Sequence, residues 1–214
     1  MDEEITIINT NTRNEKIKNF FIYNKKKLIT IISIILIITI GYLSFDSIRN
    51  KNKIKLANKF NITKINFKVE DKKKTIKDLT DIVKEHDVTY SPLALYFLID
   101  NNLIESQYEI NALFDELINE TNLEDEIKNL NVYKKALFNS NFVEENELLQ
   151  ILNPIINNDS IWKSHALYLV AEYFYQKNEI QKAKEFFNQI LILPNANNDI
   201  KLASQKRVNR DLSE

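Results

Sequence analysis

The sequence predicts an all-α protein, in which a single N-terminal transmembrane helix precedes a solenoid of short α-hairpins that ends in a capping helix. Three observations lead to this prediction. An uncharged apolar run of eighteen residues lies near the N-terminus. After it, apolar residues recur at intervals of three and four, which is the period of an amphipathic helix. No stretch alternates apolar and polar residues for long enough to predict a strand.

The apolar run Leu28–Phe45, LITIISIILIITIGYLSF, is predicted to cross a membrane. As an α-helix that rises about 1.5 Å per residue, it would extend roughly 27 Å, close to the hydrocarbon thickness of a bilayer. A buried core helix this uniformly apolar would be unusual in so charged a chain, and a signal peptide has a shorter apolar segment and a small-residue cleavage site. We therefore expect a tail at residues 1–24, a transmembrane helix at 25–46 and a helical domain at 47–214.

The basic residues that flank this run bear on its orientation, because an excess of Lys and Arg favours the cytoplasmic side. The two flanks are nearly balanced. Six basic residues precede the run and five follow it: Arg13, Lys16, Lys18, Lys25, Lys26 and Lys27, then Arg49, Lys51, Lys53, Lys55 and Lys59. The triple lysine that touches the run favours a cytoplasmic N-terminus.

The composition excludes several classes of function. The 214 residues include no cysteine, so neither a disulfide nor thiol chemistry is available. The only glycine, Gly41, lies within the apolar run, which leaves no glycine-rich loop to cradle a phosphate or a dinucleotide. A net charge of −1 gives no electrostatic reason to expect nucleic acid as a partner. We expect no cofactor and no small-molecule substrate.

Ile48, Ala57 and Phe60 predict a basic helix that continues out of the span, and three more helices are predicted after it. An amphipathic helix is expected across about 72–86, and Ser91-Pro92 indicates a second helix start, with the serine as the cap and the proline in the first turn. The inward faces of this region are expected to hold Ile76, Leu79, Ile82, Val83, Leu95, Leu98 and Ile99, packed against a partner helix with Ile110, Leu113, Phe114, Leu117 and Ile118.

The middle of the chain contains a predicted capping box, in which the side chains of Thr121 and Glu124 each bond to the other's backbone N–H. The helix after this capping box is expected to end at the break Asn139-Ser140-Asn141. That helix is expected to bury Ile127, Leu130, Tyr133 and Leu137, and the next one Leu148, Leu149, Leu152, Ile155 and Ile156.

The last hairpin has the clearest pattern. Its helices carry inward residues at helical spacing around the turn Lys177-Asn178-Glu179: Trp162, Ala166, Leu169, Val170, Tyr173 and Phe174, then Ile180, Ala183, Phe187 and Ile190. Small residues allow two helices to approach closely, and this hairpin has them at Ala171 and Ala183. Together with Phe174, Phe187 and the following Pro194, this placement resembles the tetratricopeptide repeat. The repeat's proline position falls on Asn195, one residue beyond Pro194, and Ile190 replaces its third alanine.

An internal comparison supports a repeat. The segments Ala166-Leu167-Tyr168 and Phe187–Ile190 align with Ala94-Leu95-Tyr96 and Phe114–Leu117, although any two amphipathic helix pairs could align this well. A terminal repeat needs a polar outer face, and the chain's last helix provides one. We expect that helix across 200–212, with Ala203 and Val208 inward and Lys201, Lys206, Arg207 and Arg210 outward.

The order of these features resembles the bacterial inner-membrane tetratricopeptide-repeat-like proteins that are ancillary subunits of the Sec translocon, in their short alphaproteobacterial form. The resemblance is carried by Asp2-Glu3-Glu4, Gly41-Tyr42, Trp162–Ala166, Ala183–Phe187 and Leu193-Pro194. It implies a cytoplasmic N-terminus, a periplasmic helical domain, and a non-catalytic adaptor that links the translocon to periplasmic chaperones or to emerging client chains. A scaffold for cell division or envelope assembly is the alternative.

The repeat register also predicts a protein-binding groove on the first helix of each hairpin. The residues expected to line it are Tyr96, Asp100, His165, Tyr168, Glu172 and Tyr175. Tyrosines suit peptide recognition, but Tyr96 and Tyr168 could instead pack between hairpins. His86 and His165 are too far apart in sequence for a metal pair on one helix. The acidic clusters at 124–126 and 144–147 suit the first turns of helices better than a carboxylate-based hydrolase.

Overall fold

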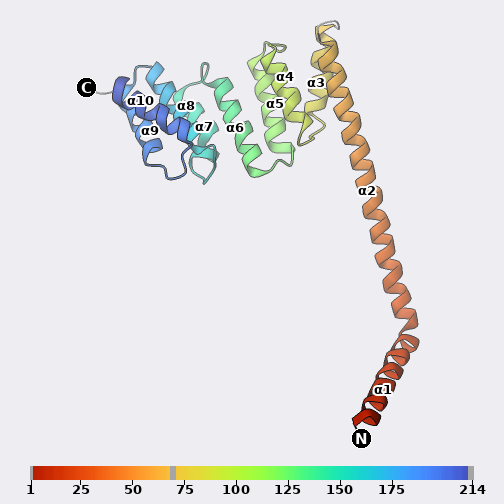
Figure 1. Cartoon of the computed structure of the whole chain (residues 1–214). Coiled ribbons are helices and arrows are strands. Elements are labelled where there is room, and N and C mark those ends of the chain that lie inside the picture. The colour runs from red at the N-terminus through yellow and green to blue at the C-terminus, as the bar shows by residue number, and fades with distance from the viewer. Residues whose placement is uncertain (1, 68–70, 212–214) are drawn as a thin grey trace. The chain divides into compact units, whose positions relative to one another are not determined.

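The computed structural model describes residues 2–67 and 71–211, and within these ranges the chain forms helices and no strand (Figure 1). This confirms the all-α prediction. The internal contacts divide the chain into two units, Met1–Lys55 and Leu56–Glu214.

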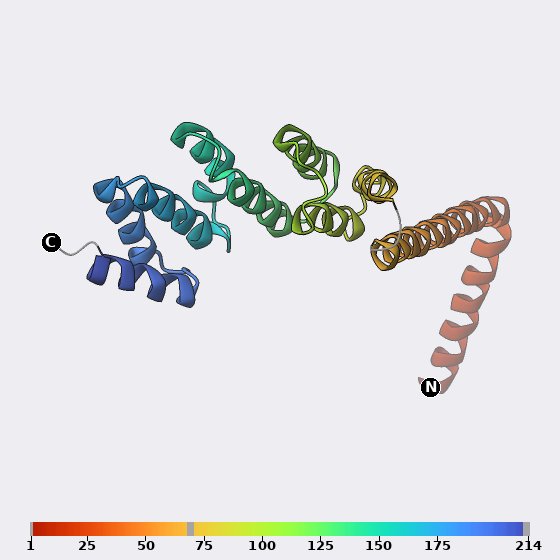
Figure 2. The same cartoon turned by 90° about the horizontal axis from the view of Figure 1, so that it is seen from above.

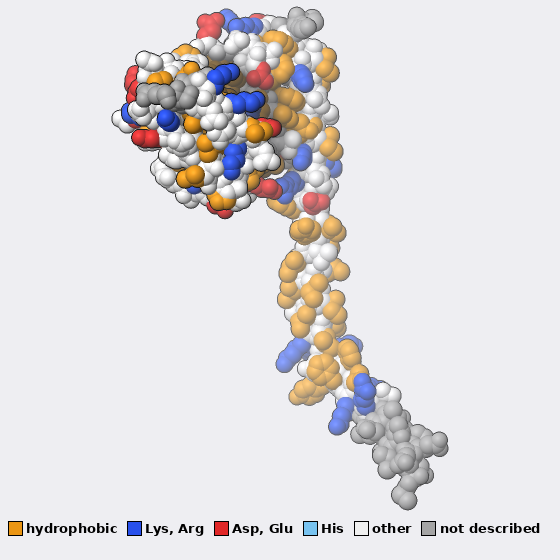
Figure 3. Space-filling model, turned by 60° about the vertical axis from the view of Figure 1, so that its left-hand side comes forward, with side chains coloured by type: hydrophobic (Ala, Val, Ile, Leu, Met, Phe, Trp, Pro, Cys, Tyr) orange, Lys and Arg blue, Asp and Glu red, His pale blue; other side chains and the backbone are white. Residues whose placement is uncertain are grey.

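The first unit contains α1 (Asp2–Tyr23) and most of α2 (Lys25–Asn66). By length and composition α2 is a candidate membrane span, and none of the residues in its apolar window is buried. Figure 3 shows apolar side chains around this part of the helix. The hydroxyls of Thr30 and Thr39 donate to the carbonyls of Lys26 and Ile35 at 3.0 and 2.8 Å. These side-chain donors are therefore satisfied within the helix.

The second unit is a row of helices in which each one from α3 to α10 packs against the next (Figures 1 and 2). Helices two apart also touch in the pairs α3–α5, α6–α8 and α8–α10. The end of α2 joins the row through Phe60, whose ring lies 6.0 Å from that of Tyr90. The helices are α3 (Lys72–Val83), α4 (Tyr90–Asp100), α5 (Gln107–Glu120), α6 (Asp125–Asn139), α7 (Glu145–Ile156), α8 (Lys163–Gln176), α9 (Ile180–Ile192), α10 (Asn198–Lys206) and the π-helical η1 (Arg207–Asp211).

One continuous apolar core runs through this row. Its largest fully buried side chains include Phe114, Phe174 and Phe187. The inward faces predicted for α3, α5, α7 and the α8–α9 hairpin are buried or half-buried as expected. The aligned segments also show matching burial, with all of these residues inaccessible or nearly so: Ala94 and Ala166, Leu95 and Leu167, Phe114 and Phe187.

The prediction for α6 was wrong in two respects. Thr121 ends α5 rather than capping α6, and its buried hydroxyl has no hydrogen-bond partner among the described residues. Ile127 and Leu137 are 42% and 49% exposed. The face that is buried instead carries two asparagines: Asn131, Val132, Ala136 and Asn139. The physical reason is that these asparagines are satisfied inside the stack. Asn139 and Asn111, for example, exchange two side-chain hydrogen bonds of 2.9 and 2.7 Å.

The helix boundaries show one further correction and one confirmation. Asp87, not Ser91, accepts the backbone N–H groups of Thr89 and Tyr90, at 2.9 and 2.8 Å, while the buried Ser91 hydroxyl donates to the Ile82 carbonyl. The turn between α8 and α9 lies where it was expected. There Asn178 has a φ of 59°, a left-handed conformation that asparagine tolerates better than most residues.

Replacing Phe114 by alanine should lower the free energy of unfolding by about 3–5 kcal/mol, because the ring is 1% exposed and its removal leaves a cavity in the core. Tyr108 lies on the same helix but is 85% exposed, so Tyr108→Ala is the matched control and should change stability by less than about 0.5 kcal/mol. Denaturant titration of the full chain in detergent, followed by circular dichroism, measures both. Equal losses for the two variants would contradict the core described above.

Candidate protein-binding surface

The C-terminal segment of the chain covers part of the predicted groove on α8. Arg207, in η1, donates through Nε and Nη2 to the two carboxylate oxygens of Glu172, at 2.7 and 2.8 Å. Its guanidinium also lies 4.7 Å from the centre of the Tyr175 ring. The expectation that Arg207 points outward was therefore wrong, because its side chain is half-buried against α8. Both Glu172 and Tyr175 are engaged within the chain.

The other two predicted residues of α8 are also packed. The centres of the Tyr168 and Phe187 rings lie 5.6 Å apart. Burial is the largest cause that raises the pKa of the Tyr168 hydroxyl, and the adjacent Glu172 raises it further. His165 lies beside Trp162 and Tyr133, with ring centres 5.1 and 6.0 Å away. Burial lowers the pKa of His165, and its Nδ1 is buried without a hydrogen-bond partner in residues 2–67 and 71–211.

Tyr96, on α4, contacts α6. Its hydroxyl donates to Asn131 Oδ1 at 2.7 Å, and the Lys134 ammonium lies 4.0 Å from the ring centre. Burial raises the pKa of Tyr96 to about 12. Asp100 is exposed at the end of α4. The structure therefore uses Tyr96 and Tyr168 for packing between helices, while the protein-binding role of the six residues stays a prediction.

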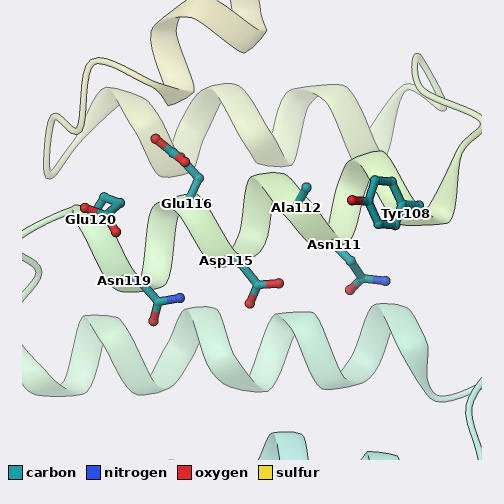
Figure 4. A pocket seen from close by; sticks show the side chains of 7 residues that line it. All are labelled: Tyr108, Asn111, Ala112, Asp115, Glu116, Asn119 and Glu120. Carbon is teal, nitrogen blue, oxygen red and sulfur yellow. The ribbon is translucent and has the colours of Figure 1, made fainter.

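The surface of α5 carries a groove to which the sequence pattern assigned no role. It has a volume of about 380 Å³ and is lined only by residues of α5: Tyr108, Asn111, Ala112, Asp115, Glu116, Asn119 and Glu120. Figure 4 shows Asn111, Asp115 and Asn119 pointing toward one neighbouring helix and Glu116 pointing to the opposite side. These residues recur every three or four positions and together cover the solvent-facing side of the helix.

Neighbouring elements hold the polar side chains of this groove in place. Lys135 on α6 donates to Asp115 at 2.6 Å, and His86 Nε2 lies 2.7 Å from Glu116 Oε1. Tyr108 stands free at one end, with 85% of its surface exposed. The groove thus combines an aromatic anchor with the exposed Asn119 amide and Glu120 carboxylate, which can bond to the backbone and to basic side chains of a peptide.

The described residues show no group of three or more His, Cys, Asp or Glu side chains that could hold a metal ion. The acidic clusters lie in the first turns of α6 and α7, as predicted, and neither lines the groove on α5. Glu145 accepts a hydrogen bond from Lys182 at 2.7 Å. Hydrogen bonds to Glu145 and Glu179 raise the pKa of Lys182 to about 12. The cluster on α7 thus joins this helix to α9.

Comparisons with protein-family models, with curated proteins and with solved structures gave no match.

The Tyr96 hydroxyl should make stability depend on alkaline pH. Its folded pKa of about 12 lies above the ordinary value of 10.0, so the neutral form stabilises the fold fully below pH 10. That contribution is lost as the pH rises from 10 through 12. Tyr96→Phe should cost about 1–2 kcal/mol at neutral pH by leaving Asn131 Oδ1 without its donor. The difference in unfolding free energy between wild type and variant, measured against pH, should shrink above pH 10; a constant difference would contradict the assignment.

Removing the Arg207 side chain should loosen the cover over α8. Arg207→Ala deletes a bidentate ion pair to a half-buried carboxylate, so amide hydrogens of Asn198–Lys206 should exchange roughly tenfold faster. The matched control is Lys206→Ala, which removes an exposed side chain of α10. Hydrogen exchange followed by mass spectrometry compares the two, and unchanged exchange in Arg207→Ala would show that the pair does not hold the segment.

Proposed function

We propose that this chain is a membrane-anchored, non-catalytic adaptor that binds segments of other proteins on its helical stack. One observation carries the proposal. None of the residues in the apolar run Leu28–Phe45 of α2 is buried, yet further along the same helix contributes Phe60 to the core of the stack. An apolar surface this long is far larger than water-exposed patches on soluble proteins, so lipid is its natural surrounding.

The stack itself supports a binding role. Serially packed hairpins form a solenoid, and helical-repeat proteins use the extended concave surface of such a solenoid to bind other chains. The α8–α9 hairpin has the close approach expected of a tetratricopeptide-like unit, because Ala171 and Ala183 are both fully buried and the Phe174 and Phe186 rings stack at 5.5 Å. We take the stack to be a solenoid of this type, with α10 and η1 as its cap.

We place the partner segment in the groove on α5. The groove is open, its side chains are held by α6 and His86, and Tyr108 offers an exposed ring at its end. In contrast, the residues first expected to line a groove on α8 are engaged with Arg207 and Phe187. A tethered adaptor needs only modest affinity at such a site, since confinement to a membrane raises the effective concentration of its partners.

The proposed partners are those that the resemblance implies: Sec translocon subunits, and periplasmic chaperones or unfolded client chains. In this arrangement α2 crosses the bacterial inner membrane once, the N-terminus is cytoplasmic, and the helical stack is periplasmic.

Photo-crosslinking in cells tests this function. With p-benzoylphenylalanine in place of Tyr108, we expect crosslinks to translocon subunits or chaperones, identified by mass spectrometry. The same group in place of Ile192, which is 80% exposed on α9, is the matched control and should not give them. Ala112→Arg places a long side chain in the groove and should reduce the Tyr108-site crosslinks about tenfold, a loss of about 1.4 kcal/mol of binding. Crosslinks only to division proteins, or an identical pattern from both positions, would contradict the proposal.

A further inference from the structure

Four basic side chains follow the apolar run of α2 within its next three turns. We call Arg49, Lys51, Lys53 and Lys55 the basic collar. All four are exposed, and none makes an ion pair within the part of the chain that the structure describes. From Asp46 to Phe67 the sequence has six basic residues and one acidic residue, Asp46, so the segment that holds the collar keeps a net positive charge. Lys59, further along, differs because it pairs with Asp81 at 3.7 Å.

The position of the collar along α2 matters more than its charge. At about 1.5 Å per residue, Arg49 lies roughly 6 Å and Lys55 roughly 15 Å beyond Phe45, the last residue of the apolar run. The headgroup layer on each side of a bilayer is roughly 5–8 Å thick. Electrostatic attraction extends about 8 Å further at physiological salt. The whole collar therefore falls within reach of headgroup charges when Leu28–Phe45 occupies the hydrocarbon layer.

We propose that the basic collar binds the headgroups of acidic phospholipids in the leaflet where the membrane-spanning part of α2 ends. This inference rests on the membrane anchor of the proposed function, but it is independent of the protein partner. Acidic headgroups are the one class of anion that the anchor keeps permanently beside these four side chains. The exposed Ile48, roughly 4–5 Å beyond Phe45, suits the same boundary, because Lys and Arg can extend their charged ends to headgroups while an apolar neighbour faces the hydrocarbon.

Energy transfer from a labelled chain in lipid nanodiscs tests the proposal. The chain has no cysteine, so Asn52→Cys gives a single donor site within the collar. Acceptors are placed on the headgroups of phosphatidylglycerol or of phosphatidylcholine in otherwise identical discs. We expect a roughly two- to fivefold preference for phosphatidylglycerol near the donor, and a smaller preference at high salt.

Variants of the full chain separate the collar from general charge. Replacing Arg49, Lys51, Lys53 and Lys55 together by glutamine should abolish the preference at Asn52→Cys. The matched control replaces four exposed lysines of α3 and the residue after it by glutamine, namely Lys72, Lys73, Lys77 and Lys84, and should keep it. A donor at Asn24→Cys, beside the lysines on the other flank, should be unaffected by either change.

Each outcome decides something. Equal transfer to the two lipids in the wild-type chain, or a preference that survives the collar substitution, overturns the lipid site and leaves the anchor standing. Transfer to neither lipid shows that α2 does not enter the disc, which overturns the anchor and the collar together. Loss of protein crosslinks at Tyr108 with an intact lipid preference would instead overturn only the adaptor role.

Discussion

Among the described residues, no side chain in the apolar part of α2 is buried, and this is the constraint from which the rest of the structure follows. A helix satisfies its own backbone groups, and here Thr30 and Thr39 satisfy their hydroxyls in the same way, so the segment needs nothing polar around it. Because those apolar side chains are not available to the core, the second unit must stabilise itself. It does so without disulfides, through one core that extends from Phe60 on α2 to Ile190 on α9.

Hydrophobic periodicity could predict most of this core, because the inward positions of α3, α5, α7, α8 and α9 are occupied by apolar residues. It failed at α6, where the inward positions include Asn131 and Asn139. A buried asparagine is stable only when its amide is paired, and the partners Tyr96 and Asn111 lie on other helices. No local pattern contains that information. The predicted cap at Ser91 was wrong for a related reason, because the carboxylate of Asp87 accepts the backbone N–H groups of Thr89 and Tyr90 instead.

The candidate site was less predictable than the fold. The repeat register correctly grouped Tyr168, Glu172 and Tyr175 on one face of α8, but it could not show that Arg207 covers that face. Basic residues near the end of a chain usually face water, and only the path of α10 and η1 brings this one back. The groove on α5 was hidden for the opposite reason. Its polar residues have the same pattern as any solvated helix face, so its shape depends on where α6 and His86 lie.

The polar contacts between helices that are not adjacent in the chain leave the groove on α5 open. Tyr96 on α4 donates to Asn131 on α6. The indole N–H of Trp162, at the start of α8, donates to the backbone carbonyl of Glu126 on α6 at 3.0 Å. Arg207 on η1 donates to Glu172 on α8. In each contact the polar groups are already hydrogen-bonded within the chain and are not available to a ligand. Each contact also joins elements that are not adjacent in the chain. Helix α5 makes its polar contacts to α6 and His86 while leaving Tyr108 and the groove open. A partner that docks there need not break any contact between the helices, so the stack can bind it as a preformed surface and lose no stability in doing so.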